Sequence, residues 1–298
     1  MSFLELLAGF RTEAGNLFFQ LITMCAQEMI VIAIICWLYW CSNKKLAYSL
    51  AFSYFTSGLL VQGLKIAFRI PRPWVINPEF KAVESAVPGA TGYSFPSGHT
   101  QSITALFGTF AFYVKNKIAK ILCFIVIFLV GFSRMYLGCH TPKDVIVAFV
   151  ITILCTALCY HFIYKKDFLE GKEKNVLAVM MTICILLIIY ACTLCKTETI
   201  TQEYAADCIK AASAGAAFSI GFYIERTHLR FQSPSSSKDK ILLFVSGLTL
   251  TLVIHIGLKK LLGISLISSF IRYFFTVLWI TVFYPVIFTK FNFFQSTK

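Results

Sequence analysis

The chain has 298 residues, of which 58% are hydrophobic, 16% aromatic and only 14% charged. Soluble proteins carry about 25% charged residues, so the composition excludes an ordinary soluble enzyme and predicts a protein with many membrane-spanning helices. The formal net charge is +13, but the basic residues are spread over short loops. This distribution favours a role in membrane topology over nucleic-acid binding.

Apolar segments long enough to cross a hydrocarbon core of about 30 Å follow one another along the chain. The pattern predicts an all-α, polytopic integral-membrane helical bundle with about nine transmembrane helices. No long linker rich in proline, serine or glycine separates them, so residues 1–298 are expected to form a single membrane domain. The predicted spans are 17–41, 47–65, 98–114, 118–138, 144–164, 175–195, 207–224, 241–258 and 268–289.

Lysines in the loops set the expected orientation. Lys44 and Lys45 follow the first span, so this loop is expected to be cytoplasmic. The amino terminus then lies outside and the carboxyl terminus inside, and the lack of an Asn-x-Ser/Thr glycosylation sequence favours a bacterial plasma membrane. Three basic residues on the predicted outer face do not fit this rule well: Lys259, Lys260 and Arg272.

Most of the eleven cysteines fall within apolar spans, where they are expected to act as small hydrophobic residues. Cys192 and Cys195 form a C-x-x-C pair near the outer end of a helix, with Cys208 further along, so a disulfide is an open possibility. A zinc site is not expected there, because histidines are lacking nearby.

Small residues are concentrated in the span at 207–224. Such a surface allows close helix packing, either within one chain or in a homodimer, and both alternatives are open at this stage. The residues are Ala211, Ala212, Ala214, Gly215, Ala216, Ala217 and Gly221.

Polar residues form a first island after the second span, with Lys65 and then Arg72 followed by proline. Cations near a membrane core are costly unless they meet an anion. Arginine is suited to bidentate contact with phosphate oxygens. We therefore expect both residues to bind phosphate.

A second island, Ser97-Gly98-His99, opens the third span. Ser97 is expected to cap this helix, and Gly98 lets the backbone approach a ligand at the positive end of the helix. A histidine at a helix start is usually solvated or part of a cap, whereas beside a phosphate it can act as a general acid.

The third island holds Arg134, His140 and Asp144, at the end of the fourth span and the start of the fifth. Asp144 is three residues after Thr141, so it can close a capping box. It is also one helical turn from His140, where it can orient the imidazole. Two crossings separate this island from the first two, so all three are expected on one face of the membrane.

Together the islands resemble the signature of the type 2 phosphatidic acid phosphatase superfamily over roughly residues 60–150. The resemblance implies a six-helix phosphatase core at about 15–165 and accessory helices at about 175–290. It implies that His140 is a nucleophile that becomes phosphorylated, with Asp144 as its partner and His99 as the general acid. It also implies a phosphate pocket without metal or cofactor, made by Lys65, Arg72, Ser97, Gly98 and Arg134.

The expected substrates are therefore membrane lipids that carry a phosphate monoester or a diphosphate, such as phosphatidate, phosphatidylglycerol phosphate or undecaprenyl diphosphate. Two alternatives are open. Nine spans with an outer amino terminus are similar to glucose-6-phosphatase, which acts on a soluble sugar phosphate. A non-catalytic lipid-binding protein of the same family is disfavoured, because both His99 and His140 are present.

Overall fold

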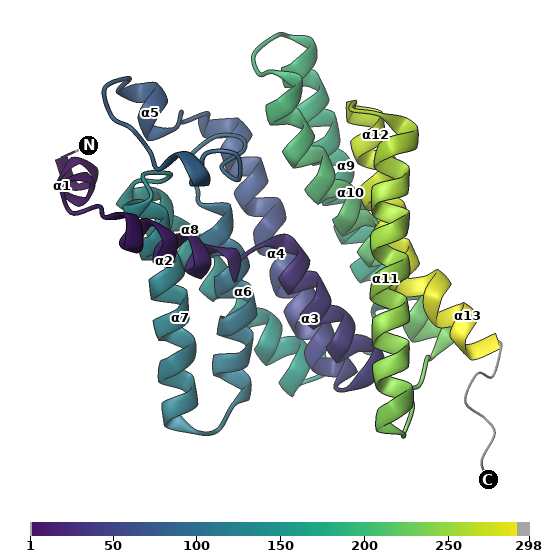
Figure 1. Ribbon diagram of the computed structural model, residues 1–298. Coiled ribbons are helices and arrows are strands. Elements are labelled where there is room, and N and C mark those ends of the chain that lie inside the picture. The colour runs from purple at the N-terminus through teal and green to yellow at the C-terminus, as the bar shows by residue number, and fades with distance from the viewer. Residues whose placement is uncertain (1, 291–298) are drawn as a thin grey trace. The chain divides into compact units, whose positions relative to one another are not determined.

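The computed structural model describes residues 2–290, and these residues form helices and loops without a β-strand. The bounds of the α-helices are α1 Ser2–Gly9, α2 Glu13–Met24, α3 Glu28–Cys41, α4 Lys44–Phe68, α5 Pro73–Ile76, α6 Gly98–Tyr113, α7 Lys117–Tyr136, α8 Pro142–Cys159, α9 Glu173–Lys196, α10 Gln202–Ile224, α11 Ser237–Leu262, α12 Leu266–Leu278 and α13 Tyr284–Lys290 (Figure 1). A short 3₁₀ helix covers Glu84–Ala86, and π-helical turns cover Tyr160–Lys165, Glu225–Leu229 and Trp279–Phe283.

The all-helical membrane fold is confirmed, but the count of nine spans is not. Within residues 2–290, six segments are both long and apolar enough to cross a membrane. Helices α4, α6 and α10, which match the second, third and seventh predicted spans, are not in this set. The six segments are Glu13–Cys41, Lys117–Tyr136, Pro142–Lys165, Glu173–Lys196, Ser237–Leu262 and Leu266–Lys290.

The first predicted span, 17–41, is not one continuous helix. It divides into α2 and α3, which have 12 and 14 residues and are separated by a turn in which the Gln27 amide donates to the Met24 carbonyl at 3.0 Å. A helix that crosses the membrane alone needs about 20 residues. Hydropathy does not reveal the turn because apolar residues lie on both sides of it.

The chain divides into two compact units, each described here by itself. One unit comprises the residues up to Ile32 together with Ser49–His161, and the other comprises Ala33–Tyr48 and the chain from Phe162 onward. The single domain expected over 1–298 stays a prediction, and its last residues, 291–298, lie outside the described part of the chain.

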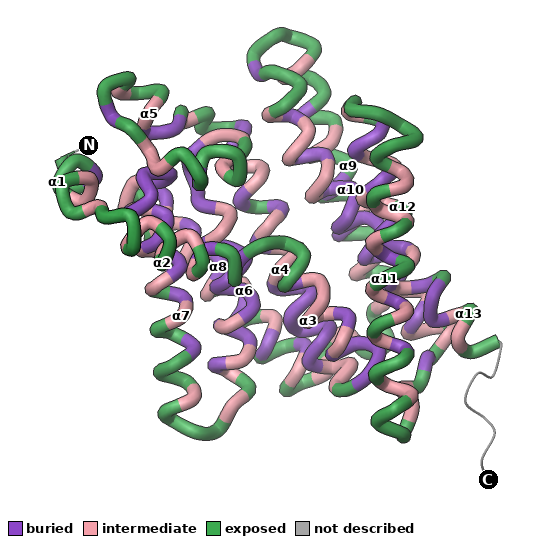
Figure 2. The backbone as a smooth tube through the Cα atoms, in the orientation of Figure 1, coloured by how far each residue is buried: buried purple, intermediate pink, exposed green. Residues whose placement is uncertain are grey.

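In the first unit, α6 packs against α7 and α8, and α7 also contacts α1 and α2. Polar side chains join α4 to α6 and α8: Ser53 Oγ lies 2.6 Å from Thr156 Oγ1, and Gln101 Nε2 donates to the Tyr54 carbonyl at 3.0 Å. Such hydrogen bonds hold helices together where lipid replaces water. Figure 2 shows exposed positions recurring along α7, and among them are Ile121 and Phe128, as expected for a surface that faces lipid.

In the second unit, α10 packs against α9 and α12, and α12 also packs against α11. The small residues of α10, including Ala212, Gly215 and Ala216, are buried against these helices of the same chain. The predicted close packing is therefore present within the unit, and the homodimer stays a prediction. All eleven cysteines are free thiols, so Cys192, Cys195 and Cys208 form no disulfide.

Candidate active site

The three polar islands meet at one end of the first unit. Three parts of the chain form the site: the segment after α4, the N-terminus of α6, and the connection between α7 and α8 (Figure 1). Two backbone hydrogen bonds fix these segments together: the Ser94 amide donates to the Ile70 carbonyl at 2.8 Å, and the Ser97 amide donates to the Asp144 carbonyl at 3.0 Å. The predicted convergence of the islands is therefore present in the structure.

His140 lies in the connection between α7 and α8 and is only 1% exposed. Its Nε2 accepts a hydrogen bond of 2.8 Å from Arg72 Nη1. Its Nδ1 faces Asp144 Oδ2 at 3.6 Å, which is longer than a hydrogen bond. This pattern assigns the proton to Nδ1 and the lone pair to Nε2, because the arginine can only donate and the carboxylate only accept.

The environment keeps His140 neutral. Burial lowers the pKa of His140 well below its usual value, and the positive charges of Arg72, Arg134 and Lys65, followed by His99, lower it further. In this structure the Nε2 lone pair accepts the hydrogen bond from Arg72 Nη1. A histidine with a lowered pKa gains a second proton only when the pH falls below that pKa, so Nε2 is unprotonated at neutral pH. That is the state a nucleophilic imidazole requires.

Asp144 performs the capping role, and its orienting role toward His140 stays a prediction. Its Oδ2 accepts the Thr141 amide at 2.8 Å and closes the capping box at the start of α8. The same oxygen accepts a hydrogen bond of 2.6 Å from Ser94 Oγ, which lies 3.4 Å from His140 Nδ1. Ser94 was not predicted, because nothing in its local sequence indicates that it reaches a carboxylate on α8.

Replacement of Ser94 by alanine is expected to lower kcat about tenfold, because a hydrogen bond to a charged carboxylate contributes about 1.5 to 3 kcal/mol. KM should change little, since Ser94 contacts Asp144 rather than the cationic groups. Threonine should restore most of the rate, and Ser85→Ala, an exposed serine in the same loop, is the matched control. A rate equal to that of the unaltered protein in Ser94→Ala would contradict this positioning role.

Lys65 and Arg72 belong to the same site and also form hydrogen bonds with the loop that precedes α6. Lys65 Nζ donates to the Tyr93 carbonyl at 2.8 Å. Arg72 Nε donates to the Gly92 carbonyl at 3.1 Å, and its Nη1 donates to the Cys139 carbonyl at 3.0 Å. These two cations therefore organise the loop around His140, in addition to the phosphate contact predicted for them.

Arg134, near the end of α7, is 2% exposed and has unused hydrogen-bonding capacity. Its Nη1 donates to Thr23 Oγ1 at 3.1 Å. Its Nε and Nη2 are buried and have no hydrogen-bond partner among residues 2–290. Two adjacent donors of one guanidinium match two oxygens of a phosphate. Thr23, which orients Arg134 from α2, is far away in the sequence and was not predicted.

The start of α6 agrees with the expectation from its motif. Ser97 Oγ accepts the Thr100 amide at 3.4 Å and so caps the helix. A Cβ atom at Gly98 would meet no atom within 4 Å, so the backbone here borders open space. His99 follows on the same turn of α6.

Metal ligands are not grouped in the described chain: no three histidine, cysteine, aspartate or glutamate side chains between residues 2 and 290 come together in a way that could hold a metal ion. The polar groups that converge at His140 are instead cations and hydrogen-bond donors. Together they form a positively charged cluster beside His140.

Comparison with known families agrees with this description. Residues 45–168 match the PAP2 superfamily, and residues 209–296 match the transmembrane extension of PAP2 superfamily phosphatases. The two matches together cover more than half of the chain. The chain therefore belongs to the type 2 phosphatidic acid phosphatase superfamily.

Three curated relatives illustrate the range of the family. Undecaprenyl-diphosphatase BcrC of Bacillus subtilis is 35% identical over 109 residues, which are 36% of this chain and 52% of the relative. Human sphingosine-1-phosphate phosphatase 2 is 25% identical over 259 residues, 84% of this chain and 62% of the relative. Phosphatidylglycerophosphatase B of Haemophilus influenzae is 35% identical over 86 residues, 26% of this chain and 35% of the relative. The chain thus spans less than two thirds of the length of each.

Proposed function

We propose that this protein is an integral-membrane phosphatase that removes phosphate from lipid phosphate monoesters or diphosphates without a metal ion. The observation that carries the proposal is two groups of one site. Arg134 has two buried donors without a partner among residues 2–290, and His140 has its Nδ1 facing Asp144. A transferring phosphoryl group needs an in-line nucleophile and cationic donors for its equatorial oxygens, and these groups supply both.

In the first proposed step, the His140 Nε2 lone pair attacks phosphorus and an N–P bond forms. The P–O bond to the leaving group breaks, its electron pair moves to the leaving oxygen, and His99 donates a proton to that oxygen. Asp144 stabilises the proton and the positive charge on the ring. In the second step, water attacks phosphorus, His99 takes the water proton, and the N–P electron pair returns to His140.

The names of the three relatives support a lipid substrate, since each relative acts on a phosphate or diphosphate carried by a lipid. Exposed apolar side chains provide a surface on which acyl or prenyl chains can lie. One of them is Phe68, at the end of α4, directly before the segment that contributes Arg72 to the site. The lysines in the loops favour the extracytoplasmic face for the site.

Phosphate release by the purified protein tests this proposal. Dioctanoyl phosphatidate should be hydrolysed with kcat/KM more than about tenfold above that of dihexanoyl phosphatidate, because each buried methylene contributes about 0.8 kcal/mol. The head group is identical in the two substrates, so the ratio reports chain binding alone. A preference for glucose 6-phosphate over both would favour a sugar phosphatase instead.

Two further arms of the same assay test the metal and the membrane face. Activity should persist in EDTA, because protein cations supply the electrostatic stabilisation, and strict dependence on magnesium would contradict the mechanism. Right-side-out vesicles should hydrolyse an added membrane-impermeant phosphate ester without permeabilisation. Activity that appears only after permeabilisation would place the site on the cytoplasmic face.

A further inference from the structure

A second group of cations lies in the other unit, where α11 and α12 pack against each other. His255 Nδ1 on α11 lies 3.1 Å from Thr276 Oγ1 on α12. The helices are joined by residues 263–265 and run antiparallel, so one turn later on α11 corresponds to one turn earlier on α12. This register brings Lys259 of α11 to the level of Arg272 of α12.

Arg272 is the unusual member of this group. It lies within α12 rather than in a loop and is 8% exposed. Its Nε is buried and has no hydrogen-bond partner in the described part of the chain, and its Cζ lies 5.3 Å from the ring centre of Tyr273. None of the ion pairs within residues 2–290 includes Arg272. A buried guanidinium in a membrane helix is costly unless an anion compensates its charge.

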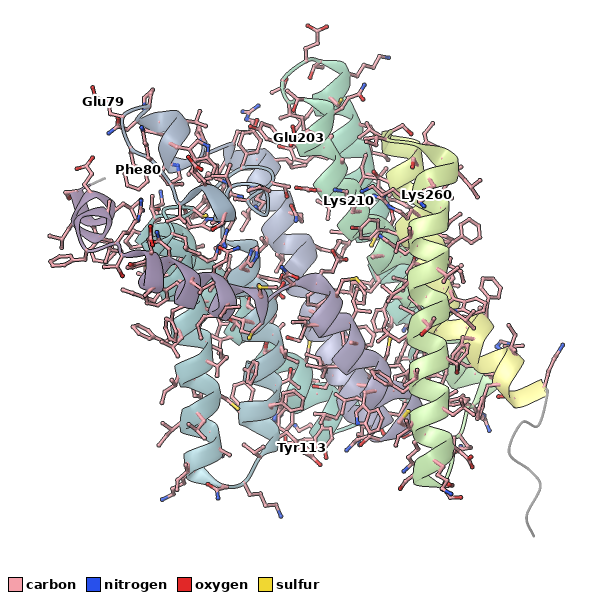
Figure 3. All side chains as sticks on the ribbon, viewed as in Figure 1. Glu79, Phe80, Tyr113, Glu203, Lys210 and Lys260 are labelled. Atoms are coloured by element: carbon pink, nitrogen blue, oxygen red, sulfur yellow. The ribbon has the colours of Figure 1, made fainter. Side chains whose placement is uncertain are left out.

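The third helix, α10, carries a lysine together with its own carboxylate partner. Helix α10 packs against α12, and Figure 3 shows Lys210 of α10 at a similar level to Lys260 of α11. Asp207 pairs with Lys210 at 2.8 Å, while Glu203 lies about 10 Å further along the axis of α10. Because Asp207 and Lys210 pair with each other, the excess of positive charge at the level of Arg272 comes from α11 and α12.

Large aliphatic side chains surround the same end of α11 and α12. Leu261 is 82% exposed, Ile264 is 96% exposed and Ile267 is 73% exposed. Exposed aliphatic residues next to lysines are typical of a protein surface at the boundary between lipid tails and head groups. The exposed aliphatic side chains favour a phosphate that is part of a lipid over a free phosphate ion in water.

We propose that Arg272, with Lys259 and Lys260, binds the phosphodiester head group of an anionic membrane lipid. Arg272 Nε donates to a phosphate oxygen, the lysines add positive charge, and Leu261, Ile264 and Ile267 contact the acyl chains. Contact with lipid phosphate explains why three basic residues on the predicted outer face do not follow the positive-inside rule. These residues are Lys259, Lys260 and Arg272. It is independent of the phosphatase reaction, since it lies in the other unit and needs no hydrolysis.

Thermal unfolding of the purified full chain in neutral detergent tests this proposal. Phosphatidylglycerol should raise the melting temperature more than phosphatidylcholine does, because a ligand that binds only the folded state stabilises it. Lys259→Gln and Arg272→Gln should each weaken the apparent affinity for phosphatidylglycerol about fivefold, as expected for one basic residue at an anionic surface. Lys238→Gln, an exposed lysine near the opposite end of α11, is the matched control and should leave the affinity unchanged.

Four results would overturn the proposal. The first is equal stabilisation of the unaltered protein by the two lipids. The second is an equal loss of affinity in Lys238→Gln and Lys259→Gln, which would indicate a general surface effect. The third is the same stabilisation by inorganic phosphate alone, which would identify a free ion as the ligand. The fourth is loss of the effect in Arg134→Met, which would place the lipid in the phosphatase site. Lys259 is exposed, so its variant keeps the test decisive if Arg272→Gln does not fold.

Discussion

Replacement of His140 by alanine is expected to lower kcat/KM by at least about 10⁴-fold, because the covalent route through the imidazole is lost and water must attack phosphorus directly. During turnover of the unaltered protein, rapid quenching should trap phosphate on His140 through an acid-labile N–P bond. The variant should carry no such label. Peptide mapping under alkaline conditions, combined with the initial rate of phosphate release, measures both effects.

His228→Ala is the matched control for this experiment. His228 is exposed and belongs to the π-helical turn Glu225–Leu229 in the other unit, so its loss should alter neither the label nor the rate. Persistence of a phosphorylated residue in His140→Ala would show that the nucleophile lies elsewhere. Full activity of that variant without any covalent intermediate would indicate direct attack by water.

The parts of the site that depend on local sequence could be predicted. His140 and Asp144 are four residues apart across the start of a helix, and that spacing alone places the carboxylate one turn from the ring. Ser97 was identified as a cap because serine before a helical segment accepts an amide of the first turn. In both cases helix geometry determines the contact, so no knowledge of tertiary structure is needed.

Contacts between distant segments could not be predicted in the same way. Thr23 supports Arg134 from 111 residues away, and Ser94 reaches Asp144 across 50 residues. Threonine and serine are common in membrane helices and loops, where they often bond to their own backbone. Their sequence context therefore does not distinguish a residue that orients a catalytic group from one that only satisfies a nearby carbonyl.

The break between α2 and α3 was missed for a different physical reason. A hydropathy window averages Gln27 and Glu28 at the break with the many apolar residues around them. It responds to the transfer free energy of side chains rather than to backbone direction. Contacts hold α2 against α7: the Phe19 ring lies 4.3 Å from that of Tyr136, and Thr23 bonds to Arg134. These contacts orient α2 toward the site and depend on packing between helices.

Arg134→Met is expected to lower kcat by about 10² to 10³-fold while leaving the protein at least as stable as before. The loss of rate follows because two preorganised donors to the transferring phosphate disappear, and one such donor is typically worth about 2.7 to 4 kcal/mol in the transition state. Stability should not fall, because Arg134 is buried without a carboxylate partner among residues 2–290 and methionine fills a similar volume. Kinetics and thermal unfolding of the phosphate-free protein measure the two effects separately.

Opposite changes in rate and stability distinguish a catalytic role for Arg134 from a structural one. A structural arginine would lose stability and activity together, and that result would contradict the assignment. The kcat of Arg134→Lys should lie between that of the unaltered protein and that of Arg134→Met, since an ammonium group restores the charge but not two parallel donors. Arg69→Ala, which removes an exposed arginine just after α4, should keep kcat within about twofold, as is usual for surface substitutions. Greater stability with lower activity in Arg134→Met would show that the fold retains this unpaired charge for binding phosphate.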